Sequence, residues 1–394
     1  MARENHSAPL EDNRFLESKI PKKKNLPLQL HWFLEEDYLS KEILGVYNHE
    51  VEQYRKIAEN AYQLFVENTD KVVKNNELIR FGIPQRYHDL FHYSWNNRDK
   101  QPFLTGRFDI NGVLNRVPGK VIEFNADTCS TLPETIFWQR IQCEKLGKGR
   151  GFNFLEESLE VVLKQIFDGL NANYQPVFLG SSLGYPEDVQ NVNTMLNLAG
   201  KQGFHPVYRD LPDVIFSEEG IFLEAGDDYT PVDVLFKLFP WDWVVNEEPE
   251  LGDLLRSIIL NEHAMVLNPF FTMLWQNKRF LNYISEQTAS QDIAKTYSTR
   301  PSLSTYVEKP IYGRIGENVR VFHSGGQESS QGDYAHQSTV FQEYVENPID
   351  QEDYTYQAGM FMVAHKAVAL NYRTSKGDII TDDCEYFTHV VLDR

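Results

Sequence analysis

One short stretch, residues 106–127, limits what this chain can fold into more than any other. Its sequence, GRFDINGVLNRVPGKVIEFNAD, carries R-x-D, then a turn with Gly and Pro, then E-x-N. In a β-strand, side chains two residues apart share a face. A hairpin that pairs 109 with 123 also pairs 107 with 125. It places Arg107, Asp109, Glu123 and Asn125 on one face, with opposed residues ~5 Å apart.

These four residue types indicate a small set of chemistries. Two carboxylates at this short separation repel each other unless a proton or a cation lies between them. Carboxylate and amide oxygens suit Mg²⁺, and an arginine beside them suits a transferring phosphoryl group. A surface strand pair with an Arg–carboxylate ion pair is a common alternative. Glycoside hydrolysis also uses paired acids, although the arginine and asparagine fit it less well. The hairpin alone leaves these uses open.

The bulk composition narrows the class of protein. The chain has 394 residues, enough for two or three subdomains, and its 41% apolar and 24% charged content is that of a folded soluble protein. A net charge of −19 argues against broad binding to nucleic acid or to a membrane surface. Three cysteines without C-x-x-C spacing fit reduced thiols in the cytoplasm. We find no signal peptide and no apolar run of the ~20 residues that a membrane span needs.

The order of elements predicts a mixed α+β and α/β chain. Apolar spacing predicts a helix over 36–75, and a second helix follows the hairpin at about 133–148. Residues 158–245 read as a parallel β-α-β unit, although the turn GSSLGY lacks the G-x-G-x-x-G of a dinucleotide site. A helix is predicted from 263, around Lys278. Strands follow from 306, with a polar loop at 324–338 and further strands at 357–371 and 377–394.

A second group of residues suits phosphate binding. The segment YVEKPIYGRIGENV (306–319) puts Lys309 at a strand end, before a loop that contains Gly313 and Gly316. Backbone N–H groups of such a loop bind phosphates while lysine supplies a charge. The spacing is not that of a Walker A loop. VFQEYV offers residues 342–344 to an adenine edge, and Lys278 is a second candidate phosphate contact. A glycine-bearing hairpin, a half-buried strand and a solvent-facing lysine are the ordinary alternatives.

Taken in order, the motifs resemble the glutathionylspermidine synthase family, in its ATP-grasp synthetase domain. The resemblance covers nearly the whole chain. It rests on these segments: FGIPQRYHDLFHYSW, GRFDINGVLNRVPGKVIEFNADT, FKLFPWDWV, NPFFTMLWQNKRFL, YVEKPIYGRIGENVRV, VFQEYV and NYRTSKGDIITDDCEYFTHVV. As in that family, the candidate metal ligands precede the nucleotide lid in the chain.

The resemblance implies roles for individual residues. Arg107 and Arg373 would act at the reaction centre, where Asp109, Glu123 and Asn125 would hold Mg²⁺, as two ions. The ATP-binding residues would be Lys278, Lys309, Gly313, Gly316, Gln342, Glu343 and Tyr344. Thr128 and Ser130 would lie near the thiol-peptide substrate. Cys129, between them, is expected to be a small packed residue rather than a reactive one.

The resemblance also implies an architecture. We expect an ATP-grasp-like fold with a Rossmann-like pre-ATP-grasp subdomain. Five parts are predicted: an N-terminal helical segment (1–105), the metal-site hairpin and following helix (106–160), the Rossmann-like subdomain (161–262), the nucleotide-binding lid (263–345) and C-terminal strands (346–394). The chain departs from the family at Asp383, where many members have Asn, and at NPFF, where they carry a Glu-Pro-containing run. It has no room for the Cys/His amidase domain of the bifunctional members.

Two functions follow from this reading. The first is an ATP-dependent ligase that activates a glutathione-like carboxylate as an acyl-phosphate for attack by an amine such as spermidine. The second is an ATP-binding grasp-fold protein without ligase activity, which acts as a regulatory or partner-binding protein. The full set of charged residues favours the ligase, because a non-catalytic protein has no need of all of them. Substrates would then be small molecules.

Overall fold

The computed structural model of the protein describes residues 8–35, 38–226, 228–323 and 326–392. Its largest sheet has seven strands, all antiparallel to their neighbours except for the parallel pair β2 and β19. In order across the sheet they are β1 (Phe15–Glu17), β2 (Leu39–Tyr47), β19 (Glu385–Leu392), β18 (Lys366–Lys376), β17 (Tyr354–Val363), β3 (Thr105–Asn111) and β4 (Lys120–Asn125).

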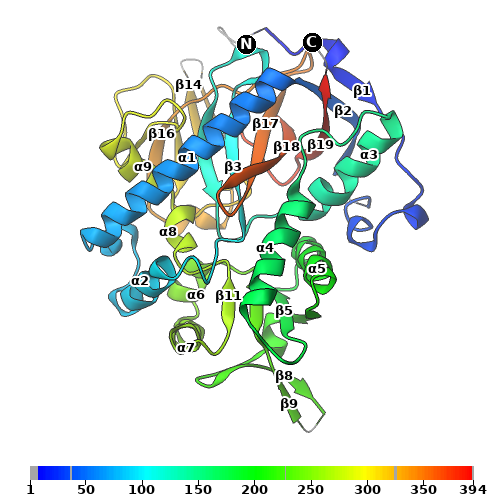
Figure 1. Cartoon of the computed structure of the whole chain (residues 1–394). Helices are drawn as coiled ribbons and strands as arrows, with labels where there is room; N and C mark the ends of the chain where they lie inside the picture. Colours follow the sequence, from blue (N-terminus) through cyan, green and yellow to red (C-terminus); the bar gives the residue numbers. More distant parts are fainter. Residues whose placement is uncertain (1–7, 36–37, 227, 324–325, 393–394) are drawn as a thin grey trace.

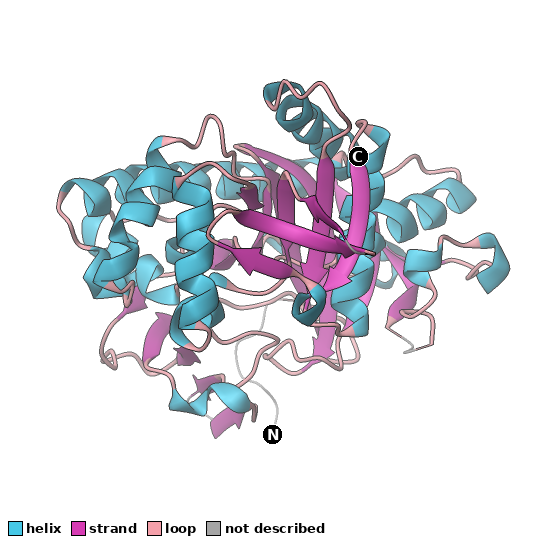
Figure 2. Cartoon of the chain, turned by 90° about the horizontal axis from the view of Figure 1, so that it is seen from below, coloured by secondary structure: helices cyan, strands magenta, loops and turns pink. Residues whose placement is uncertain are grey.

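Helices cover this sheet. The long helix α1 (Asn48–Lys74) lies across it and contacts β2, β4, β17 and β18 (Figure 1). A π-helical turn, η7 (Glu134–Trp138), leads into α3 (Gln139–Leu146), which packs against β19. Helix α2 (His88–Asn96) precedes β3. In the view of Figure 2 the strands fill the centre of the molecule and the helices flank them.

A parallel sheet of four strands forms a second layer below the first in Figure 1. Its order is β11 (Met265–Leu267), β10 (Val234–Lys237), β5 (Val177–Ser182) and β6 (His205–Asp210). Its helices are α4 (Leu155–Gly169), α5 (Pro186–Lys201), α6 (Trp241–Asn246) and α7 (Pro249–Leu260). The predicted parallel β-α-β unit is therefore confirmed, as β5, α5 and β6. A three-stranded ribbon, β7 (Ile215–Ser217), β8 (Gly220–Ala225) and β9 (Asp228–Pro231), extends beyond this layer.

A five-stranded sheet carries the predicted lid segment. It orders β12 (Thr296–Tyr297), β16 (Thr339–Glu343), β13 (Tyr306–Pro310), β14 (Arg320–His323) and β15 (Gly326–Ser329). Helices α8 (Thr272–Gln276) and α9 (Lys278–Gln287) precede it, and α9 packs against both β12 and β16. We call this unit the lid sheet. Among the described residues, no helix is both long enough and apolar enough to cross a lipid bilayer.

Three sequence predictions were wrong in detail. Within the helix predicted over 36–75, residues 39–47 form β2, while 36 and 37 lie outside the described residues. Ile43 packs in one core cluster, and Leu44 and Val46 in another, so both faces of β2 are buried. A strand buried on both faces shows no apolar/polar alternation, which explains the misreading. The first 105 residues thus contribute strands as well as helices.

The other two corrections concern the segment from β11 to the lid sheet. The helix predicted from 263 is the strand β11 followed by two helices, and the break falls at Asn277, whose side chain accepts a hydrogen bond from the Arg279 N–H and caps α9. The loop predicted over 324–338 contains β15, which pairs with β14. Residues 324 and 325 lie outside the described residues. The strands predicted over 357–371 correspond to β17 and β18, and those predicted over 377–394 correspond to β19.

A buried ion pair joins the hairpin to the parallel sheet. Lys237, at the end of β10, donates to Asp127 Oδ1 at 2.7 Å, and Asp127 Oδ2 accepts from the Trp241 N–H at 2.6 Å. Both side chains are almost completely excluded from solvent. Asn268 adds hydrogen bonds from its Nδ2 to the carbonyls of Thr105 and Ala126. The base of the β3–β4 hairpin is thereby fixed against β10, α6 and the end of β11.

We expect Lys237→Met to lower the free energy of unfolding by about 3–5 kcal/mol, because it leaves the Asp127 carboxylate buried without its cation. Urea unfolding measures the change. Lys164→Met is the matched control, since Lys164 pairs with Asp168 on the exposed face of α4. Its effect should stay below about 1 kcal/mol. Equal effects of the two substitutions would contradict this role for the buried pair.

Candidate active site

The β3–β4 hairpin pairs in the predicted register. Arg107 lies opposite Asn125, and Asp109 lies opposite Glu123, so the four side chains share one face. A bulge after Asp109 leaves Ile122 without a strand partner. The Ile122 carbonyl instead accepts hydrogen bonds from the side chains of Lys309 and Gln342, at 3.4 and 3.2 Å. The bulge therefore joins the hairpin to the lid sheet.

Asp109 is the electrostatic centre of this face. Arg107 Nε donates to its Oδ1 at 2.8 Å, Arg373 Nη2 donates to its Oδ2 at 2.7 Å, and Asn125 Nδ2 donates to Oδ2 at 3.1 Å. Burial alone would raise the pKa of Asp109, but the two guanidinium groups outweigh it and lower the pKa to about 2. The carboxylate is therefore ionised at neutral pH. Arg373, 264 positions further along the chain, comes to this face on β18.

The backbone next to Arg107 is shaped to admit its side chain. Gly359 of β17 lies opposite Asp109. A Cβ atom there would be 2.6 Å from Arg107 Cδ and 2.2 Å from Asn371 Oδ1. Arg107 Nη1 donates to the Ser130 carbonyl and to Thr131 Oγ1, both at 3.2 Å. Ser130 thus reaches the site through its carbonyl, and Thr131, which the sequence did not single out, holds the arginine.

The two candidate phosphate lysines lie beside the hairpin. Lys278 Nζ is 2.9 Å from Glu123 Oε1 and donates to the Gly313 carbonyl at 2.7 Å. Lys309 Nζ donates to Gln342 Oε1 at 2.8 Å. Burial lowers the pKa of Lys309 to about 8, and the charge of Lys278 acts in the same direction while that of Glu123 opposes it. The fold thus brings both lysines, Gln342 and Glu123 to one place.

The remaining lid residues have different contacts. The Glu343 side chain pairs with Lys120 of β4 at 2.6 Å, and the Tyr344 hydroxyl donates to Asp378 at 3.0 Å. Gly316 has a left-handed φ of +67°, and a Cβ there would lie 2.2 Å from the Ile380 carbonyl. The loop 311–318 is thereby seated on the β18–β19 connection. Thr128 is half-buried between Asp127 and Cys129, and Cys129 is buried as expected.

Four charged residues near this cluster were missed by the sequence prediction. Arg314, from the lid loop, donates to Asp242 Oδ1 of α6 at 2.6 Å. Glu187 and Asp188 occupy the first turn of α5. Burial raises the pKa of Glu187, against the charges of Arg107 and Arg373 and a hydrogen bond from Ser130. Burial, then the charge of Glu187, raises the pKa of Asp188 to about 7. Glu187 therefore faces the two arginines, and Asp188 beside it lies near Arg314.

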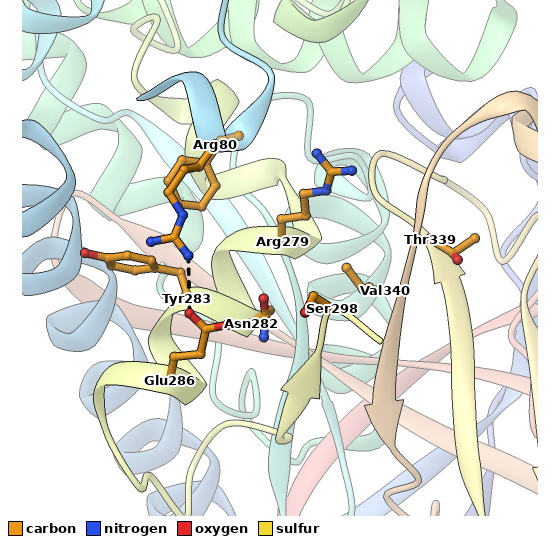
Figure 3. A pocket seen from close by; sticks show the side chains of 9 residues that line it. Arg80, Arg279, Asn282, Tyr283, Glu286, Ser298, Thr339 and Val340 are labelled. Carbon is orange, nitrogen blue, oxygen red and sulfur yellow. Dashed lines mark hydrogen bonds and ion pairs between the residues drawn. The ribbon is translucent and has the colours of Figure 1, made fainter. Parts of the chain in front are cut away.

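A cavity of 250 Å³ lies between α9 and the lid sheet (Figure 3). Arg80, Arg279, Asn282, Tyr283, Ser298 and Thr339 are among its lining residues, and Arg80 is already engaged by Glu77 and Glu286. None of the predicted site residues lines this cavity. The candidate active site is instead the cluster around Asp109, because predicted site residues from β3, β4 and β18 converge there.

The fold is ATP-grasp-like, as predicted. A solved structure of a glutathione synthetase-like effector from Globodera pallida matches it with a TM-score of 0.58 and 11% identity, over 92% of this chain and 95% of that one. The model of the glutathionylspermidine synthase pre-ATP-grasp family matches residues 22–392. The chain belongs to this family, which points to ATP-dependent ligation of an acid and an amine, with ATP and Mg²⁺.

Curated relatives agree with this assignment. A Haemophilus influenzae protein named "Putative acid–amine ligase" is 25% identical over 80% of this chain and 81% of its own length. The bifunctional glutathionylspermidine synthetase/amidase of Escherichia coli is 22% identical over 79% of this chain and 56% of that protein. Trypanothione synthetase of Crithidia fasciculata is 24% identical over 72% of this chain and 46% of that protein. The chain thus spans about half the length of the last two.

Gly359→Ala should lower ATP turnover on the order of 10²–10³-fold, because the new methyl group displaces the Arg107 guanidinium from the reaction centre. Steady-state kinetics measure the loss, and circular dichroism checks the fold. Gly169→Ala is the matched control, since a Cβ there meets no atom within 4 Å. A Gly359→Ala enzyme with unchanged turnover would show that the arginine position is not critical.

Proposed function

We propose that this protein joins a peptide carboxylate of the glutathione type to an amine such as a polyamine, at the expense of ATP and through an acyl-phosphate. One observation carries the proposal. Arg107 and Arg373, which suit a phosphoryl group, converge on Asp109. The Glu187 carboxyl, which suits a cation and is followed by that of Asp188, faces the same two arginines. A site with adjoining anionic and cationic halves matches an acyl-phosphate and an alkylammonium ion.

The half of the site proposed to bind the phosphoryl group contains four positively charged side chains, three from strands and one from a helix. Lys278 and Lys309 would hold the ATP phosphates, next to Glu123 and beneath the loop 311–318. Arg107 and Arg373 would stabilise the charge on the transferred group, because buried guanidinium groups bind phosphoryl oxygens in a planar, bidentate manner. Asp109 orients both arginines through its two oxygens. Gln342 and its neighbours 343 and 344 would border the adenine.

The residues proposed to hold Mg²⁺ fit that ion. Asp109 and Glu123 present hard oxygen donors from directly opposed strand positions, and Asn125 adds an amide oxygen on the same face. Arg107 and Arg373 keep the Asp109 carboxylate ionised, and Lys278 forms an ion pair with Glu123. When bound, Mg²⁺, as one or two ions, would offset the negative charge of the ATP phosphates.

The half of the site proposed to bind the peptide acid and the amine would lie along residues 128–131 and the start of α5. Thr128 and Ser130 would contact the peptide whose carboxylate receives the phosphoryl group. Glu187 and Asp188 would bind the ammonium group of the second substrate, because they are half-buried neighbouring carboxyl groups and Glu187 is within reach of the arginine pair. The amine nitrogen would attack the carbonyl carbon of the acyl-phosphate, the C–N bond would form and phosphate would leave.

The lid loop would protect the acyl-phosphate from water. The Gly313 carbonyl accepts from Lys278, and Arg314 pairs with Asp242, so the loop bridges α9 and α6 above the hairpin. A closed loop excludes water, which would otherwise hydrolyse the activated acid.

The test is the release of phosphate from Mg-ATP, with glutathione-like peptides crossed against polyamines. ADP and phosphate that form only when acid and amine are both present support the ligase. Tight ATP binding without turnover on any pair favours the second function, an ATP-binding protein that regulates a partner. The same panel identifies the acid and the amine.

Arg107→Ala and Glu123→Ala should each reduce ligation on the order of 10²–10³-fold or more, because each removes a positioned charge at the phosphoryl group. Thermal unfolding by circular dichroism should show that the fold is kept. Arg86→Ala serves as control, since this arginine is half exposed. Near-normal ligation by either site variant would disprove the assignment.

A further inference from the structure

The two arginines of the site differ in the hydrogen-bond donors that they have free. A guanidinium group carries five N–H groups. On Arg107 four of them are engaged: those of Nε and Nη2 by Asp109, one each, and the two of Nη1 by oxygens of the segment 130–131. On Arg373 only Nη2 has acceptors, Asp109 Oδ2 at 2.7 Å and Gln357 Oε1 at 3.0 Å. In the described part of the chain nothing accepts from its Nε or Nη1, so these donors remain for a substrate.

Three neighbouring strands bring polar side chains to one side of Arg373. Gln357 of β17 lies opposite Arg373 of β18, and Gly359 of β17 lies opposite Asp109 of β3. Residues two apart on a strand share a face, so Gln357 shares the face of Gly359, and Asn111 shares that of Asp109. Asn111, Gln357 and Arg373 therefore form a polar row across the three strands, and both amide side chains are buried.

Hydrogen bonds continue along this row to the end of the lid sheet. Arg373 Nη2 donates to Gln357 Oε1, and Gln357 Nε2 donates to Asn111 Oδ1 at 3.0 Å. Asn111 Nδ2 in turn donates to the Val345 carbonyl at 3.0 Å. Val345 follows β16 and comes directly after residues 342–344, which are proposed to border the adenine. An unbroken chain of hydrogen bonds thus joins the reaction-centre arginine to the nucleotide side of the site.

The two ends of this chain determine how both amides are oriented. A guanidinium group can only donate a hydrogen bond, and a backbone carbonyl can only accept one. The Gln357 amide must therefore turn its oxygen to Arg373, and the Asn111 amide must turn its nitrogen to Val345. Turning either amide over would set two donors or two acceptors against each other in a buried site, which is costly. Each amide thus has one favourable orientation.

We propose that Gln357 and Asn111 are positioning residues that aim the free N–H groups of Arg373 at the transferred phosphoryl group. This inference rests on the proposed ligase function. Asp109 and Gln357 both accept from Nη2, and two acceptors on one nitrogen fix the plane of the guanidinium. Donors that are held in place before the reaction stabilise developing charge without having to reorient. Because the chain ends at Val345, the position of the arginine also depends on the segment next to the nucleotide.

A double-mutant cycle tests whether Gln357 acts through Arg373. With Mg-ATP, a glutathione-like peptide and a polyamine, Gln357→Leu should lower kcat on the order of 10–10²-fold, because a hydrogen bond from a charged donor is lost. The KM for ATP should stay within a factor of about two, since the interaction acts in the transition state. Arg373→Ala should lower kcat on the order of 10²–10³-fold. Adding Gln357→Leu to Arg373→Ala should cause no further loss.

The same logic applies to Asn111, which acts through Gln357. Asn111→Leu should lower kcat by about 2–10-fold, because it removes a hydrogen bond between neutral groups. This loss should vanish when Gln357→Leu is already present. Asn68→Leu is the matched control, since Asn68 is a fully buried amide within α1 that donates to the Leu64 carbonyl at 2.7 Å. It should leave the kcat of folded enzyme within a factor of about two in both backgrounds.

Rescue by guanidinium ion gives a readout that does not depend on how much enzyme is folded. In Arg373→Ala the added ion should bind between Asp109 and Gln357 and restore part of the lost rate. The guanidinium concentration that gives half of this effect should rise about tenfold or more when Gln357→Leu is added, because one of the two acceptors is gone. A loss of folded enzyme would lower the rates and leave this concentration unchanged.

The outcomes that overturn the inference are distinct from failure of the proposed function. In an active enzyme, losses from Gln357→Leu and Arg373→Ala that multiply would mean that Gln357 acts independently of the arginine. Absent rescue, or a half-effect concentration that Gln357→Leu leaves unchanged, would show that Gln357 does not hold the guanidinium. A wild-type enzyme that turns over no pair of acid and amine would contradict the proposed ligase function, and the inference with it.

Discussion

The buried ion pair between Asp127 and Lys237 is the interaction on which the rest of the site depends. Asp127 ends the hairpin motif, and Lys237 ends β10, one of the two inner strands of the parallel sheet. Thr272 of α8 donates to Asp127 Oδ1 at 3.2 Å, and this is the oxygen that also accepts from Lys237. Moving either residue away would leave the other charge buried without a partner, which is costly, so the pair fixes the two residues relative to each other. It therefore sets where the hairpin, the parallel sheet and the lid helices lie relative to one another.

Charge compensation governs the site that this junction holds together. Each carboxylate on the hairpin face is paired with a cation: Asp109 with Arg107 of its own strand and Arg373 of β18, and Glu123 with Lys278 of α9. These pairs orient the acids and the cations before any substrate arrives. Such preorganisation is what makes electrostatic stabilisation of a phosphoryl group effective. Beyond the arginines, Glu187 and Asp188 make the neighbouring part of the site acidic rather than basic.

The parts of the site that the sequence could predict are those that local geometry decides. The alternation of R-x-D and E-x-N around a turn determines the register of Arg107 against Asn125, which the structure confirms. The parallel β-α-β unit was predictable because glycine and the change of period mark its boundaries. The strand β2 was not, since burial on both of its faces removes the alternation that marks a strand.

The remaining parts depend on long-range packing. Nothing local shows that Arg373 reaches Asp109, so its place followed from family resemblance and not from spacing. Glu187 and Asp188 could have been suspected, because they follow the carboxyl end of β5, where parallel sheets bind ligands.

Transfer of oxygen from the acid to phosphate tests the central claim most directly. The acid substrate is labelled with ¹⁸O in its carboxylate and incubated with Mg-ATP, the amine and the enzyme, and the released phosphate is analysed by mass spectrometry. An acyl-phosphate intermediate requires that one labelled oxygen appear in each phosphate, because the C–O bond breaks when the amine attacks. Unlabelled phosphate, formed while amide accumulates, would contradict the account.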